Sequence, residues 1–404
     1  MVKRPLYPFV IKLGRIGDMV MLTAPLRLLR ARYGKPCCVV GADAWAPEVY
    51  RGLSEVEWCG SLPRKAPTLL GLNWLAIRRA LRATAPGPVY VFEHHPGQVR
   101  RIRRLLRLSG VDPRRCLFID EAPGTESLWL DALLRFARQT PPALSAADYP
   151  EPAGDWSPRL RVLDVERAER DRWLRARGFR GEPLVVVQPG NHRTMGRRRL
   201  RNWRGRDDKL WPVERWVRLL HKLHARLPDA RLILRGAAAE MPLLESIRAA
   251  AGLTCVTSAG TELRPLFALC EVAHSMISVD SGPAHSAAAL GVPLVVLYGT
   301  QSSQVWLPRS SNGSPVLGLG GPPQFERAEQ ISVDAVFDAW CSLIDGTVAA
   351  HAHAHAQAQA QAGAGSESAA QAAAQADFEP PPTPLSSQMT SVRIEPSALS
   401  SSVR

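Results

Sequence analysis

The chain has 404 residues, of which 46% are hydrophobic and 22% are charged, so it can bury two ordinary domains and is not disordered or fibrous as a whole. Its seven cysteines include no CxxC or Cys/His zinc spacing, which indicates reduced, structural thiols rather than a disulfide framework. The formal net charge of +14 predicts an anionic partner, whether phosphate groups, nucleic acid or an acidic membrane surface.

The first predicted element is a strand from Pro8 to Leu13, which ends at Gly14 and leaves no signal-peptide core. The chain also lacks an apolar run long enough to span a bilayer, so we expect a cytoplasmic protein. The loop GRIGD then opens an amphipathic helix that continues to Tyr33, and Asp18 falls at its start. Taken alone, Asp18 is typical of an N-terminal capping carboxylate. The loop lacks the G-x-G-x-x-G spacing of a dinucleotide site.

Strand-like and helical runs alternate from Val39 to Pro158, which predicts a parallel sheet with helices on its faces. A basic run from Arg100 to Arg107 falls on one of these helices. It is typical of a solvated surface, and it would also suit an acceptor rich in phosphate or carboxylate groups. Five prolines between Pro141 and Pro158 predict the domain boundary.

The second half begins with a strand from Leu184 to Gln188, followed by an arginine-rich run from Arg193 to Arg206. Arginine with an interleaved aromatic can bind nucleic acid. The run leads directly into the string DDKLWP, which contains Lys209 and opens an amphipathic helix ending near Leu227.

Further ligand-binding signals follow the next strands. Glu240 stands four residues after Gly236, where it is either a ribose ligand or an ordinary acid in the first turn of a helix. The stretch from Ser275 to Thr300 reads as strand, small-residue turn, helix and strand. Its turn, DSGP, presents backbone N–H groups and the positive end of a helix dipole, an arrangement suited to an anion. Because parallel strands end at one edge of a sheet, these signals should lie together.

Three strings, GRIGD, DDKLWP and DSGPAH with AAALGVPLVVLYG, occur in the order found in glycosyltransferase family 9, the lipopolysaccharide heptosyltransferases, and the chain resembles that family from about residue 9 to 345. The resemblance implies Asp18 as catalytic base. It implies donor-binding roles for six residues, which are Lys209, Glu240, Asp280, Ser281, Gly282 and His285.

The chain departs from the family pattern at two places. Family members often have hydroxyl residues just before the DDK string, where this chain has Arg204 and Gly205, so the donor fit can differ there. Thr300 stands where proline is common, a change from which we expect little effect.

The resemblance also implies an α/β fold of the GT-B type, with two Rossmann-like domains facing a cleft. We expect an acceptor-binding domain over 1–158 and a nucleotide-sugar domain over 159–330. A helix over 331–346 should pack back across the cleft, and the low-complexity tail over 347–404 should be disordered.

The implied function is inverting transfer of a sugar, heptose from ADP-heptose, to the core of lipopolysaccharide or to a lipid-linked glycan, at the anionic inner face of the inner membrane. Neither a metal nor another cofactor is expected. Arg15, Arg100 and Arg104 are candidate acceptor ligands. The alternatives are a family member with another nucleotide sugar or glycan, and a non-catalytic polyanion-binding protein on the same fold, although nucleic acid is not the expected partner.

Overall fold

The computed structural model describes residues 4–42, 45–63, 72–124, 127–191 and 207–346. These residues belong to one compact unit. The arginine-rich run over 193–206 and the tail over 347–404 lie outside the described residues, so the predictions made for them stay predictions. Within the described ranges no helix is both long and apolar enough to cross a membrane.

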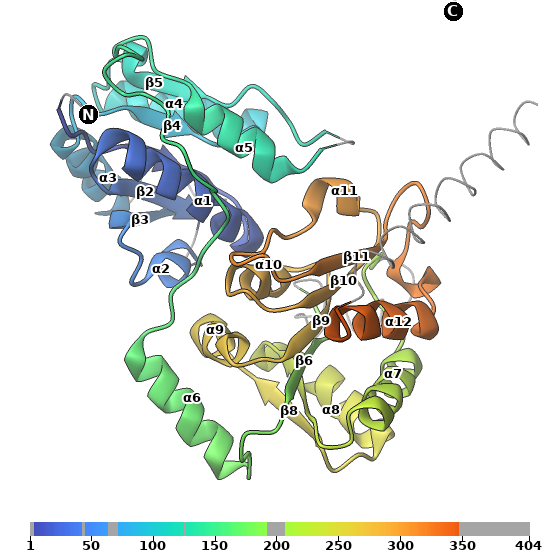
Figure 1. Cartoon of the computed structure of the whole chain (residues 1–404). Coiled ribbons are helices and arrows are strands. Elements are labelled where there is room, and N and C mark those ends of the chain that lie inside the picture. The colour runs from blue at the N-terminus through green and yellow to red at the C-terminus, as the bar shows by residue number, and fades with distance from the viewer. Residues whose placement is uncertain (1–3, 43–44, 64–71, 125–126, 192–206, 347–404) are drawn as a thin grey trace, which may run out of the picture. The chain divides into compact units, whose positions relative to one another are not determined.

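The first sheet consists of β1 (Phe9–Ile11), β2 (Cys37–Ala42), β3 (Val56–Leu62), β4 (Val89–Val91) and β5 (Cys116–Phe118). Its order is β3-β2-β1-β4-β5, and the strands are parallel (Figure 1). The three central strands are buried along their whole length. Their sequences are short continuous apolar runs, as expected where helices cover both faces of a parallel sheet.

The second sheet consists of β6 (Leu184–Gln188), β7 (Arg231–Gly236), β8 (Val256–Gly260), β9 (Ser275–Val279), β10 (Leu294–Tyr298) and β11 (Val316–Gly320). Its order is β11-β10-β9-β6-β7-β8, again parallel. The prediction of two parallel-sheet α/β domains is therefore confirmed. In each sheet the carboxyl ends of the strands meet at one edge, which is where ligands bind in such folds.

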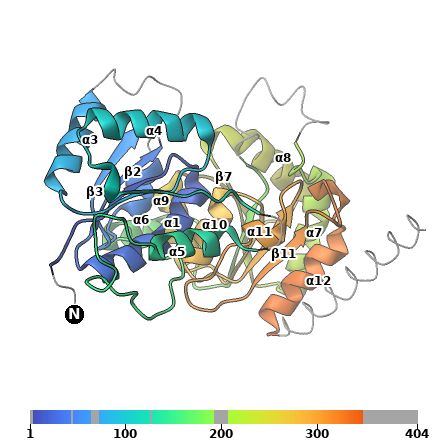
Figure 2. The ribbon, with the colours of Figure 1, turned by 90° about the horizontal axis from the view of Figure 1, so that it is seen from above.

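Helices cover both faces of the first sheet. One face carries α1 (Ile16–Tyr33), α2 (Trp45–Tyr50) and α5 (Trp129–Arg138). The other carries α3 (Leu72–Ala83) and α4 (Pro96–Leu108), which pack on Phe9 and Ile11. Figure 2 shows these two groups of helices on opposite sides of the sheet.

The second sheet is covered in the same way. The helices α9 (Leu263–Glu271) and α10 (Gly282–Ala289) share one continuous apolar core with α1 and α5. The opposite face carries α7 (Val213–Arg226), α8 (Met241–Ala251) and α12 (Val333–Ile344). The helix α6 (Asp164–Ala176) packs beside α9, and the short α11 (Ser303–Trp306) precedes β11.

The last helix lies on the second sheet. The main contacts of α12 are with α7, β10 and β11, all in the second half of the chain. Its Trp340 is buried there and donates a hydrogen bond from Nε1 to the Ser275 hydroxyl at 2.9 Å. The apolar side chains of α12 are buried in the core of the second sheet.

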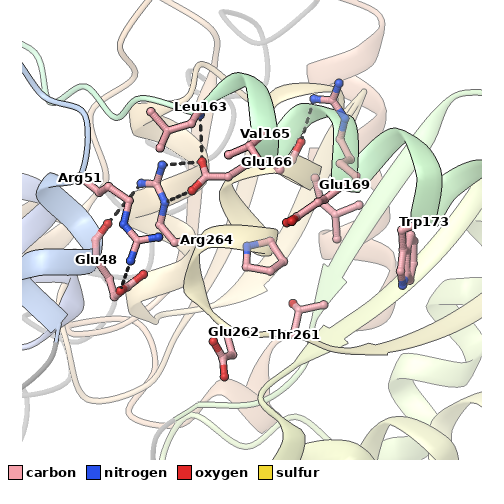
Figure 3. A pocket seen from close by; sticks show the side chains of 14 residues that line it. Glu48, Arg51, Leu163, Val165, Glu166, Glu169, Trp173, Thr261, Glu262 and Arg264 are labelled. Carbon is pink, nitrogen blue, oxygen red and sulfur yellow. Dashed lines mark hydrogen bonds and ion pairs between the residues drawn. The ribbon is translucent and has the colours of Figure 1, made fainter.

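Arg264 on α9 connects three separate segments (Figure 3). Its guanidinium donates to both carboxylate oxygens of Glu166 on α6, at 2.7 and 2.5 Å, and to the carbonyl oxygens of Arg161 and Glu48. The two side chains of the ion pair are only 5% and 9% exposed. Burial alone would raise the pKa of Glu166. The hydrogen bonds from Arg264 and from the Leu163 N–H outweigh burial, so this pKa lies below its ordinary value.

We expect Arg264→Met to lower the free energy of unfolding by about 3–5 kcal/mol, because it leaves the Glu166 carboxylate buried without its cation. A group whose pKa is depressed by folding stabilises the fold above its unfolded pKa, and that stabilisation is lost as the pH falls through the folded pKa. The difference from wild type should therefore be largest at about pH 7 and smaller at about pH 3, below the ordinary glutamate pKa. Urea unfolding at both pH values measures it.

The matched control is Arg226→Met, which breaks an exposed ion pair with Asp345. Exposed pairs contribute little, so this variant should unfold close to wild type. Equal destabilisation by the two substitutions would mean that the buried Arg264 pair contributes no more to the free energy of unfolding than the exposed Arg226 pair.

Candidate functional site

Asp18 lies in the first turn of α1, at the edge where the strands of the first sheet end. Its Oδ2 accepts a hydrogen bond from the Arg15 N–H at 2.8 Å. The helix begins at Ile16 and its N-cap residue is Arg15, so Asp18 lies inside the helix rather than at the cap. The carboxylate both closes the first turn and remains partly accessible.

Lys12 forms an ion pair with Asp18. It follows β1, is 3% exposed, and its Nζ lies 3.7 Å from Asp18 Oδ1. Next to β1, at the end of β4, the buried Glu93 accepts hydrogen bonds from the N–H groups of Leu13 and His95. Glu93 thus connects the segments that follow β1 and β4, and the segment after β1 includes both Lys12 and Asp18.

His94 stands beside this group. Its pKa is lowered, first by burial and then by the charge of Lys12, against opposing effects of Glu93 and Asp18. Its ring meets Trp129 of α5 edge-on, with centroids 5.5 Å apart. A neutral imidazole is therefore favoured at this edge of the first sheet.

Lys209, the lysine of the DDK string, lies beside the strand end of β9. Its Nζ contacts the Asp280 carboxylate at 2.5 Å and the Asp280 carbonyl oxygen at 3.2 Å. Both side chains are largely buried. The structure thus brings two predicted donor residues, 71 positions apart in the chain, into one ion pair.

The two aspartates before Lys209 hold its loop in place. Asp207 accepts hydrogen bonds from the Asn191 side-chain amide and from the Lys209 N–H. Asp208 Oδ2 accepts from both the N–H and the hydroxyl of Thr300, at 2.8 and 2.7 Å. A proline at this position would have neither donor, so these two hydrogen bonds depend on Thr300.

The helix α10 begins against α1. Ser281 is its N-cap residue, and Gly282 is its first residue. A Cβ atom on Gly282 would lie 2.7 Å from Cβ of Ile16, so only glycine allows this approach. On the next turn, His285 lies against Gly17, where an added Cβ would be 3.0 Å from the imidazole Cδ2. The first turns of α1 and α10 are therefore in contact.

His285 connects the two halves of the site electrostatically. Its pKa is lowered, chiefly by burial; Asp280 and Asp18 act to raise it, and Lys209 acts to lower it. The buried ring is thus neutral near pH 7. A neutral imidazole can donate one hydrogen bond and accept another.

Glu240 lies at the end of the short 3-10 helix η3 (Ala238–Glu240) and is buried. Its Oε2 accepts a hydrogen bond from the Ala237 N–H at 2.7 Å. This contact is the one expected of an ordinary acid in the first turn of a helix. Nearby, Arg235 at the end of β7 donates to Gln188 and Thr261, and burial lowers its pKa to about 10. The edge next to Glu240 is therefore rigidly hydrogen-bonded.

The three candidate acceptor residues are dispersed. Arg15 is exposed beside Asp18, at the start of α1. Arg100 and Arg104 are exposed on α4, which covers the opposite face of the sheet from α1. Among the described residues, no contact joins either of these two arginines to Asp18.

A pocket of about 540 Å³ lies elsewhere, between α2, α6 and α9 (Figure 3). None of the predicted site residues lines it. Its charged lining includes the Arg264–Glu166 and Arg51–Glu48 pairs, which already neutralise one another. The pocket is therefore separate from the site formed by α1 and α10.

Sequence patterns did not single out Lys12, Glu93 or Arg235, and they marked Thr300 only as a departure from the family pattern. The available signal was a charged residue directly at the end of a buried strand, which is costly without a partner. For Thr300 the signal was the departure from proline itself.

Comparison with protein families finds a similarity in the second half of the chain. The model of glycosyltransferase family 9 (heptosyltransferase) matches residues 201–332. This region includes Lys209, Glu240 and the turn from Asp280 to His285. Among curated proteins, none matches the chain.

The fold resembles several solved structures. The glycosyl transferase family 9 of Veillonella parvula DSM 2008 matches with a TM-score of 0.66 and 16% identity over 85% of this chain and 98% of that one. ADP-heptose LPS heptosyltransferase II of E. coli matches with a TM-score of 0.62 and 20% identity, over 85% of this chain and 99% of that one. E. coli heptosyltransferase WaaC with ADP matches with a TM-score of 0.58 and 16% identity, over 84% of this chain and 100% of that one.

These likenesses extend over both sheets and establish a GT-B-like fold. The family model covers residues 201–332, and this part of the chain is similar to glycosyltransferase family 9, the heptosyltransferase family.

Proposed function

We propose that the chain transfers heptose from ADP-heptose to a lipopolysaccharide core acceptor, with inversion at the anomeric carbon. The observation that supports this most strongly is the contact between the first turns of α1 and α10. It brings Asp18 into the electrostatic environment of His285, next to the Lys209–Asp280 pair.

Asp18 is the proposed general base. It would accept the proton of an acceptor hydroxyl while the hydroxyl oxygen bonds to the anomeric carbon. Lys12, with its ammonium 3.7 Å away, would hold the carboxylate in position. Since a positioned base contributes about 10²–10⁴-fold, Asp18 would account for part of the rate enhancement and substrate positioning for the rest.

Lys209 and the first turn of α10 are proposed to receive the diphosphate. As the bond from the anomeric carbon to the diphosphate oxygen breaks, its electron pair stays with the departing nucleotide. The developing negative charge is stabilised by the ammonium group and by backbone N–H groups that have no acceptor within the helix. Ser281 and Gly282 supply that turn, with His285 as a hydrogen-bond donor and Glu240 at the ribose.

The choice of ADP-heptose follows from similar proteins, two of which are described with ADP or ADP-heptose. In our proposal the domain over 1–158 binds the acceptor, with Arg15 nearest to the base. The protein would act at the inner face of the inner membrane. Another nucleotide sugar remains an alternative, because Arg204 and Gly205 replace residues that often contact the donor in the family.

We expect Asp18→Asn to reduce turnover by about 10²–10⁴-fold, because the amide cannot accept the proton. Binding of ADP should persist, since the amide keeps the size of the side chain. Single-turnover transfer from ADP-heptose and calorimetry with ADP measure the two effects. A variant with normal turnover would exclude Asp18 as the base.

We expect Lys209→Met to weaken ADP binding by about 10–100-fold, because a hydrogen bond to a charged group contributes about 1.5–3 kcal/mol. Calorimetry with ADP, UDP and GDP on both proteins tests this and the nucleotide preference together. Lys222→Met is the control, since Lys222 forms an exposed pair with Asp334. Preferential UDP or GDP binding would contradict ADP-heptose as donor but not the transferase.

The variant His285→Gln tests whether the lowered pKa of the buried imidazole makes the stability of the fold depend on pH. Because folding lowers the pKa of His285, the unfolded chain binds its proton more readily. The wild type should therefore lose stability relative to the variant as the pH falls below about 6.5. Melting temperatures at several pH values measure it, with the exposed His221→Gln as control. A pH-independent difference would show that His285 does not titrate this way.

A further inference from the structure

Two neighbouring helices of the first domain contain many arginines and no acidic residue. The sequence of α3 is LNWLAIRRALRA, and that of α4 is PGQVRRIRRLLRL. A net charge of +14 distributed at random would leave some aspartate or glutamate on such helices. The positive charge of these two helices is therefore not offset within them.

The packing of the two helices turns these arginines outward. Ile77 and Leu81 of α3 and Ile102 and Leu105 of α4 are buried on the same face of the first sheet. The opposite sides of the helices are exposed, and Figure 2 shows them on the side of the sheet away from α1 and α5. We call the exposed arginines the arginine face; its members are Arg79, Arg82, Arg100, Arg103, Arg104 and Arg107.

The arginine face lacks compensating charge. Some arginines on other helices pair with acids, as Arg167 does with Glu271, Arg226 with Asp345 and Arg248 with Glu245. In the part of the chain that the structure describes, no member of the arginine face has an ion-pair partner. Arg103 instead lies over the ring of Phe118, at 3.9 Å. These charges remain available to an external anion.

The same helices expose large apolar side chains. Leu75 on α3 is 55% exposed and Leu108 on α4 is 43% exposed. Cations interspersed with exposed leucines suit the interface of an anionic bilayer, where ammonium and guanidinium groups meet phosphates and apolar side chains enter the acyl boundary. Single-stranded nucleic acid would require exposed rings for stacking, but Trp74 is half-buried with Arg78 over its ring.

We propose that α3 and α4 form the surface by which this protein docks on an anionic lipid bilayer. The proposal extends the proposed function, since an acceptor of that kind is a membrane lipid. It also fits the topology, because α4 starts directly after Glu93, His94 and His95 at the edge that carries Asp18. Docking through α3 and α4 would keep that edge near the membrane surface.

The test is co-sedimentation of the full chain with vesicles of phosphatidylcholine alone or mixed with phosphatidylglycerol. The variant is the triple substitution Arg79→Gln, Arg82→Gln and Arg107→Gln, none of which is a proposed substrate ligand. Its partition onto the anionic vesicles should fall on the order of 100-fold, because each of the three arginines contributes a similar factor to binding at such a surface. Neutral vesicles should bind neither protein appreciably.

The matched control carries Arg172→Gln, Arg175→Gln and Arg180→Gln, exposed arginines on and after α6. It has the same net charge as the first variant, so it separates position from total charge. It should bind anionic vesicles nearly as well as wild type. Equal losses in both variants, or undiminished binding by the first, would overturn the proposal.

Calorimetry with ADP on the same proteins keeps this proposal separate from the proposed function. ADP binding by all three, with vesicle binding lost only in the first variant, supports both. ADP binding without any vesicle binding by wild type would refute the docking surface and leave the transferase intact. Vesicle binding as expected without ADP binding would support the surface and refute the nucleotide-sugar site.

Discussion

The site depends on the close approach of two helix N-termini, those of α1 and α10. Gly17 and Gly282 allow it, because a side chain at Gly282 would collide with Ile16 and one at Gly17 would press on His285. Two positive dipole ends repel one another unless negative charge lies nearby. Asp18 and Asp280 provide this charge, one inside the first turn of α1 and the other just before α10. A site arranged in this way is already suited to a further anion.

The charged side chains of the site are held by partners, some close in the chain and others distant in sequence. Lys12 follows a strand and faces Asp18, Lys209 contacts Asp280, and Asp208 holds both donors of Thr300. Because these contacts are largely buried, the side chains lose little freedom when a ligand binds. Such preorganisation is the main means by which an enzyme stabilises charge that develops in a transition state.

The positive charge of the protein serves two separate purposes in this structure. In the site, Lys12 and Lys209 are paired with carboxylates, so the site has little excess charge of its own. On α6 and α9, Arg167 and Arg264 pair with Glu271 and Glu166 and stabilise the packing of helices. Within the described ranges, part of the excess is located on the outer layer of the first domain, where no ion pair involves the arginine face.

The sequence by itself determined most of the fold. It predicted β6, β9 and β10 with their observed bounds, because each is an apolar run between turn residues. It did not predict β3 or β11, which are edge strands with mixed polarity or glycine and therefore lack that pattern.

The family resemblance of its motifs also singled out Asp18, Lys209 and the turn from Asp280 to His285 as candidates. Only the tertiary structure decided that Lys12 faces Asp18, that Thr300 holds Asp208, and that α12 stays on the second sheet. It likewise separated Arg100 and Arg104 from Asp18 by a whole sheet. The physical reason is that periodicity and turn chemistry act over a few residues, whereas these contacts depend on how two sheets and their helices pack.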